Sequence, residues 1–139
     1  DVSEAVIFIG FTDTISTTIE LPIFLVAAAI DSDATNACGV GYDVDGTTKQ
    51  FFQGGVKADT DTTPVYLGSA PADGVYFIAR VEVSAAGAVQ GFINGVAIGN
   101  PVPNAATITT ALTPAIIVAN RSANAVVATV DYVMVQQNR

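Results

Sequence analysis

Apolar and polar residues alternate along much of the chain, and the clearest case is the segment 75–85. Phe77, Ala79, Val81 and Val83 fall on one side of a strand there, and Arg80, Glu82 and Ser84 fall on the other. Successive side chains of a strand point to opposite sides, so the pattern predicts a strand with one buried and one solvated face. No long window shows the three- and four-residue apolar spacing of an amphipathic helix. We therefore predict an all-β chain.

Turn-forming residues interrupt the apolar runs at short intervals, as at Asp45-Gly46, Gly87 and Asn94-Gly95. Asn-Gly supplies the positive φ angles of a type I′ hairpin at low cost, so three consecutive segments are predicted to form a meander. Short strands at this spacing are typical of an antiparallel sandwich or barrel. The predicted strands cover residues 5–11, 23–30, 37–43, 49–57, 75–85, 88–93, 96–98, 115–120 and 126–135.

Two of these segments, 5–11 and 126–135, are apolar at both odd and even positions. An antiparallel sheet with one face in water normally shows a strict alternation instead. We therefore expect both strands to be central in a sheet or covered by another subunit.

The composition fits one folded domain over residues 1–139 and excludes several partners. Half of the 139 residues are hydrophobic and only 13% are charged, so the chain can bury a core. The net charge of −8 would repel a phosphate backbone, and we expect no nucleic-acid binding. The longest apolar run, 21–30, is interrupted by Pro22 and is about half the length of a membrane span, so no membrane insertion is expected. The N-terminal residues show no signal-peptide pattern.

The sequence lacks several residue types on which catalytic and metal sites are commonly built. The chain has no histidine and a single cysteine, Cys38, so it cannot form an internal disulfide, a Cys/His zinc site or a Ser-His-Asp triad. Arg80 and Glu82 share a strand face, but one carboxylate beside a cation cannot act as both acid and nucleophile of a glycosidase. We interpret them as a solvent-facing ion pair and expect no enzyme activity.

Two groups of residues are candidates for binding. Asp43 and Asp45 precede Gly46 and could offer oxygen ligands to Ca²⁺, although turn-forming aspartates are the more ordinary explanation and no other cofactor is indicated. A glycan could stack on an aromatic ring and bond to amide or guanidinium groups in turns. The candidate carbohydrate-binding residues are Tyr42, Tyr66, Asn120 and Arg121. For the tyrosines core packing is the alternative, and for the other two a role in turns.

Three segments carry a resemblance to a known superfamily. "VYFIARVEVSAAGAVQGFINGVAIG" (75–99) resembles the central meander of concanavalin A-like and laminin-G-like domains, and "VDYVMVQ" (130–136) resembles their last strand. Together with "FIGFTDT" (8–14), they resemble uncharacterised sandwich domains encoded among phage structural genes. The resemblance implies an antiparallel jelly-roll sandwich. Such domains begin with further strands, so we expect the sheet edge left here to be covered by a partner chain or by a rearranged first strand.

These observations lead to two functional hypotheses. The first is a non-catalytic structural protein of phage type, such as a head-decoration or tail-associated subunit, which forms a homo-oligomer or binds other virion proteins and is found in the virion or outside the cell. The alternative is a lectin-like carbohydrate-binding module with a glycan as its ligand. The first is preferred because its support is spread through the chain, whereas no ligand site is specific.

Overall fold

The computed structural model describes residues 2–16, 21–122 and 125–136, and in this part of the chain it contains two packed antiparallel sheets and a hairpin. The larger sheet has the order β11-β1-β4-β5-β6, with β7 also paired to β5. Its strands are β1 (Ala5–Thr12), β4 (Asn36–Asp43), β5 (Phe52–Lys57), β6 (Thr60–Asp61), β7 (Val65–Tyr66) and β11 (Thr113–Asn120). A single turn of 3-10 helix, η1 (Val2–Glu4), precedes β1.

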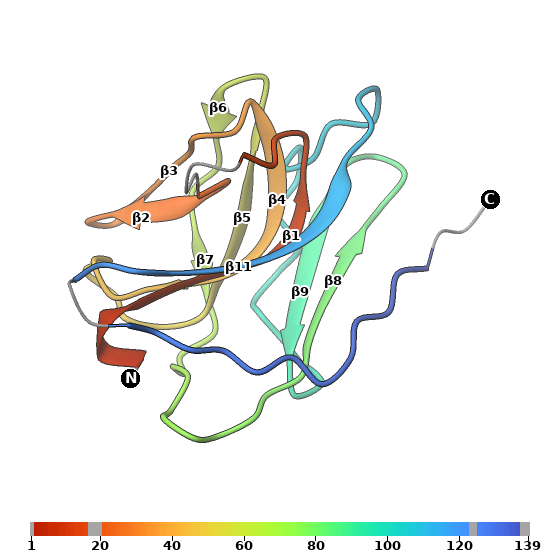
Figure 1. Ribbon diagram of the computed structural model, residues 1–139. Helices are drawn as coiled ribbons and strands as arrows, with labels where there is room; N and C mark the ends of the chain where they lie inside the picture. Colours follow the sequence, from red (N-terminus) through yellow and green to blue (C-terminus); the bar gives the residue numbers. More distant parts are fainter. Residues whose placement is uncertain (1, 17–20, 123–124, 137–139) are drawn as a thin grey trace.

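Each face of the larger sheet is covered by a smaller element (Figure 1). One face packs on the meander of β8 (Ala79–Val83), β9 (Val89–Ile93) and β10 (Val96–Ala97), and the other on the hairpin of β2 (Phe24–Val26) and β3 (Ala29–Asp31). The predicted all-β antiparallel sandwich is thereby confirmed. The jelly-roll topology stays a prediction.

The alternation of side chains along the central strands builds two cores. On the hairpin side, Phe8 and Phe52 pack with Leu25 and Ile30. On the meander side the core extends over two adjoining clusters, which contain Ala5, Val40, Tyr42, Phe51, Ile93 and Ile98, and Cys38, Val89, Val102, Ala105 and Ala106. All eight residues of β4 are buried, because β4 lies inside the larger sheet and is covered on both sides.

Glycines on β1 and β4 make room for this packing. Gly10 and Gly39 are directly opposite each other, and a Cβ atom on Gly39 would lie 2.3 Å from the backbone oxygen of Ile9. A Cβ atom on Gly41 would lie 2.4 Å from the ring of Phe52. The hairpin-side core is therefore filled by large rings resting on bare backbone.

The predicted meander is confirmed in order and in turn chemistry. β8, β9 and β10 pair consecutively, with Asn94 and Gly95 at φ angles of 50° and 80° and Gly87 at 77°. The first strand is shorter than predicted, Ala79–Val83 instead of 75–85. The predicted centrality of 5–11 is also confirmed, since β1 lies between β4 and β11.

Two predicted strands are wrong. Residues 23–30 form the β2–β3 hairpin instead of one strand, because Ala27 turns the chain at a φ of 55° and brings Leu25 opposite Ile30. Both side chains thereby enter the same core, whereas a single strand of this length would carry one of them away from it. No glycine, asparagine or proline marks this turn, so turn chemistry could not reveal it.

The second wrong prediction is the strand over 126–135. Residues 125–136, which we term the C-terminal segment, have no strand pairing with any described residue and run along the outside of the sandwich toward the C-terminus (Figure 1). Val126 packs beside the meander-side core, but Val127 and Met134 are 83% and 78% exposed. Most of the apolar side chains that predicted a strand are therefore exposed to solvent.

Among the described residues there is no helix long and apolar enough to cross a membrane.

Candidate functional site

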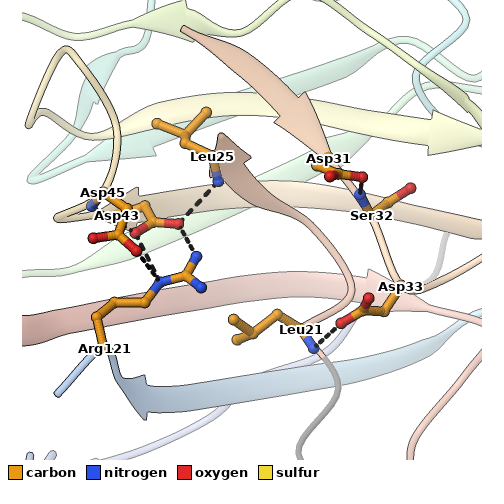
Figure 2. A network of polar contacts seen from close by, with 8 residues as sticks. All are labelled: Leu21, Leu25, Asp31, Ser32, Asp33, Asp43, Asp45 and Arg121. Atoms are coloured by element: carbon orange, nitrogen blue, oxygen red, sulfur yellow. Dashed lines mark hydrogen bonds and ion pairs between the residues drawn. The ribbon is translucent and has the colours of Figure 1, made fainter. Parts of the chain in front are cut away.

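A polar cluster joins the end of β4 to the residue that follows β11 (Figure 2). Asp43 is fully buried, and its carboxylate lies 2.5 Å from one terminal nitrogen of Arg121 and 3.2 Å from Nε. Asp45 adds a longer ion pair, with 3.3 Å between its carboxylate and Nε of Arg121. The guanidinium also lies over the ring of Phe24, 5.2 Å from its centre.

Strand register brings these two charges together from positions 78 residues apart. β1 lies between β4 and β11, with Val6 paired to Asp43 on one side and to Ala119 on the other. Arg121 is two residues beyond Ala119 and points to the same face of the sheet, so it reaches across β1. The backbone N–H of Arg121 donates to the carbonyl of Glu4, 2.8 Å away, and continues the β1–β11 ladder.

The carboxylate of Asp43 has both oxygens engaged. One accepts from the backbone N–H of Leu25 at 2.9 Å as well as from Arg121, and the other accepts from the N–H of Asp45 at 3.0 Å and from Arg121 Nε. The hydrogen bond to Asp43 raises the pKa of Arg121, and burial opposes that rise. The cluster therefore ties β2, β4 and the end of β11 together through one charge.

The geometry around Asp43 bears directly on the predicted calcium ligands. A cation placed between Asp43 and Asp45 would compete with the guanidinium of Arg121 for the same oxygens. The nearby Asp31 accepts from the backbone N–H of Ser32, which is the turn-forming role. Asp33 accepts from the N–H of Leu21, 12 residues earlier, and so joins two segments. No group of three or more acidic, cysteine or histidine side chains gathers in the part of the chain that is described. Calcium binding stays a prediction, and it would require Arg121 to move.

The four residues proposed for a glycan do not form one surface. Tyr42 is 4% exposed and packs beside Phe51 in the meander-side core. Tyr66 packs against the opposite core, next to Phe52. Burial raises the pKa of both tyrosines, for Tyr42 with added repulsion from Asp43 and Asp73.

The other two glycan candidates lie at the end of β11. Asn120 is exposed on its last position, and Arg121 is engaged by Asp43. The structure therefore brings Arg121 together with the predicted metal ligands and leaves the tyrosines apart from it and from each other.

Gln53 is a polar residue that sequence reasoning missed. It is fully buried on β5, and its Nε2 donates to the carbonyls of Ile98 and Asn100, the latter at 2.7 Å. Its Oε1 accepts from the backbone N–H of Gly91 at 2.5 Å. One side chain thus connects the larger sheet to the meander. The sequence gives a weak signal for it, a single amide in the apolar run before Gly54-Gly55.

The predicted surface ion pair is confirmed on the outer face of β8. Arg80 and Glu82 lie 2.6 Å apart with side chains 56% and 53% exposed, and the guanidinium of Arg80 is 3.7 Å from the ring centre of Phe92. Glycoside hydrolysis uses two carboxyl groups that flank the scissile bond, whereas this exposed face of β8 offers one carboxylate beside a guanidinium.

Apolar side chains are exposed over a large part of the surface near the C-terminus. Within the C-terminal segment the exposed fractions include 68% for Tyr132, 62% for Val133 and 55% for Val135. None of the eight residues of β11 is buried, and Ile116 is 38% exposed. Many exposed apolar side chains close together in sequence can mark an interaction site.

Comparison with known proteins gives no match to a family model, a curated protein or a solved structure. The molecule is therefore defined by its own architecture, an antiparallel β-sandwich whose buried polar residues connect its strands and whose C-terminal surface is apolar.

Proposed function

We propose that this chain is a non-catalytic structural subunit of phage type, such as a head-decoration or tail-associated protein, that acts by packing against copies of itself or other virion proteins. The exposed apolar surface of the C-terminal segment and β11 carries the proposal. At a net charge of −8 such a surface can stay soluble, yet its burial against another chain would be strongly favourable.

The resemblance to phage-encoded sandwich domains supports the same function. It assigns a strand to 130–136, and the structure leaves the apolar residues of that segment without a neighbouring strand among the described residues. A strand whose two faces are both apolar needs cover on both sides. An assembled particle would supply that cover from neighbouring subunits, and this supports a location in a virion or on an extracellular surface.

Mass measurement across a dilution series tests the proposal. We expect a species whose mass is a multiple of 14.2 kDa and which dissociates on dilution, because the contact forms by mass action. Removal of residues 125–139 should weaken the assembly while the far-ultraviolet circular dichroism of the sandwich is retained. A wild-type protein that stays monomeric at every concentration, alone and with other virion proteins, would refute the proposal.

A carbohydrate-binding module is the second candidate, and one observation favours it. Tyr76 is 73% exposed beside a hollow of about 190 Å³ that Phe51, Phe77, Ser69 and Asn94 help to line. An exposed ring next to polar groups suits stacking of a sugar face. A glycan array read with wild type and with Tyr76→Ala would test this site, and equal signals for the two proteins would exclude it.

A further inference from the structure

β8 is an edge strand with its outer side open. It pairs with β9 along one side, and no described residue pairs with the other. Ala79 and Val81 are half-buried, while Arg80, Glu82 and Val83 are exposed. An open edge presents unpaired backbone groups that can accept a further strand.

The hydrogen bonds to β9 show which backbone groups face outward. Asn94 donates its N–H to the carbonyl of Ile78, and Ser84 donates to the carbonyl of Ala88. In an antiparallel pair only every second residue bonds to a given neighbour, so the backbone groups of Arg80 and Glu82 also face β9. Those of Ala79, Val81 and Val83 face the open side.

The charges of β8 are self-complementary about its middle residue. We propose that two copies of the chain pair through this edge, antiparallel, with Val81 opposite Val81 of the second copy. This register places Ala79 opposite Val83, so all outward-facing backbone groups meet and about six hydrogen bonds form. It also places Arg80 of each copy directly opposite Glu82 of the other. The two three-stranded meanders become one continuous sheet across a two-fold axis.

Charged residues on an edge strand often prevent such pairing, but their arrangement here has the opposite effect. If the two charged residues of β8 had the same sign, like charges would face each other across the axis and repel. Arg80 and Glu82 are one position on either side of Val81, so opposite charges meet in both halves of the interface. Directly opposed side chains on neighbouring strands are close enough to interact. Exposed apolar groups beside the edge, at Ile78 and Val83 with 61% and 39% exposure, would be covered as well.

The other sheet edges are less suited to a second copy. β6, β7 and β10 are two residues long, and β2 and β3 are three residues long. Very short edge strands resist pairing. β11 is long, but its hydrogen bonds to β1 leave Pro114 facing outward, because Arg121 bonds to Glu4 and the alternation then turns even-numbered residues away from β1. Proline has no N–H to donate. Among the strands that the structure describes, β8 is the edge that combines length, donors and matched charges.

This inference rests on the proposed assembly role and names one contact within it. The test uses two charge reversals in the full chain, Arg80→Glu and Glu82→Arg, with dimer dissociation measured by analytical ultracentrifugation. Each reversal alone puts like charges opposite each other in both halves of the interface and should raise the dissociation constant about tenfold or more. Lys49→Glu, at an exposed position outside β8, is the matched control and should leave the constant unchanged.

Mixing the two variants separates the proposed register from any effect on the monomer. One variant carries two acids on β8 and the other two arginines, so an equimolar mixture should form heterodimers with the affinity of wild type or better. Recovery in the mixture supports the antiparallel β8 contact. Unchanged affinity of the single variants, or failure of the mixture to recover, would overturn this contact while leaving an oligomeric wild type and the proposed function intact. A wild type that never associates would overturn both.

Discussion

The ion pair between Arg121 and Asp43 makes a sharp prediction about stability. Replacement of Arg121 by methionine keeps most of the apolar stem beside Phe24 but removes the guanidinium. Asp43, which has no exposed surface, then retains only the backbone N–H groups of Leu25 and Asp45 as donors. A buried carboxylate is left without its counter-charge.

The expected loss follows from that burial. Removing one partner of a buried ion pair costs about 3–5 kcal/mol, because the remaining charge stays out of water. A domain of this size has a total free energy of unfolding of about 5–15 kcal/mol, so Arg121→Met should remove a large part of it. For a chain of this length the midpoint of thermal unfolding should fall by about 10–15 °C.

Arg80→Met is the matched control, since Arg80 also pairs with a carboxylate but in water. An exposed pair contributes less than about 1 kcal/mol, so this variant should unfold close to wild type. Both should be measured by urea denaturation at low protein concentration, where association does not contribute to stability. The double variant Asp43→Leu/Arg121→Met should recover part of the loss, because it no longer buries a lone charge, although two backbone donors stay unpaired.

Equal stability of Arg121→Met and Arg80→Met would refute the reasoning. It would mean that Asp43 reaches water in solution, and that the end of β11 is not fastened to β4 as described. The reasoning would also be contradicted if Asp43→Leu/Arg121→Met were less stable than both Asp43→Leu and Arg121→Met, because the two losses would then be independent rather than shared.

Three further predictions concern the core. Gln53→Leu should destabilise the protein by about 1–3 kcal/mol in urea denaturation, since it leaves the buried N–H of Gly91 without a partner and removes a donor from the carbonyls of Ile98 and Asn100; a neutral result would contradict its connecting role. Gly39→Ala should prevent folding or lower the unfolding midpoint severely, as its Cβ would meet β1 backbone, and a wild-type midpoint would count against the described register. Burial raises the pKa of Cys38 from 9.0 to about 12, so between these pH values the unfolded thiol ionises while the native thiol does not. The free energy of unfolding should therefore fall with rising pH, by up to about 1.4 kcal/mol per pH unit. A thiol reagent that labels the native protein rapidly at pH 8 would disprove this burial.

Elements set by local chemistry could be predicted from the sequence. The Asn94-Gly95 turn fixes the β9–β10 hairpin because the two residues themselves adopt the necessary φ angles. The alternation around Val81 likewise placed Arg80 and Glu82 on a solvent face. These features depend on neighbours within a few positions, and a pattern rule can read them directly.

Contacts between distant segments could not be predicted in the same way. Asp43 was singled out as a turn residue or metal ligand, whereas its partner is a guanidinium 78 residues later. Gln53 has only a weak sequence signal, which does not reveal that its backbone partners are Gly91 on β9 and Ile98 and Asn100 beyond β10. The turn at Ala27 is set by the demand that Leu25 and Ile30 enter one core. In each case the deciding interaction exists only once the sheets have packed.

The two segments that are apolar on both faces show how such a pattern leads to opposite outcomes. β1 satisfies it within the chain, because β4 and β11 flank it and both cores cover it. The C-terminal segment has the same pattern and is exposed over most of its length. A segment that is apolar at both odd and even positions needs packing partners on both faces, but the pattern does not show which chain supplies them. Since β1 already takes the central place in the sheet, the exposed apolar side chains of 125–136 are the physical reason to look for their packing partners in a second subunit.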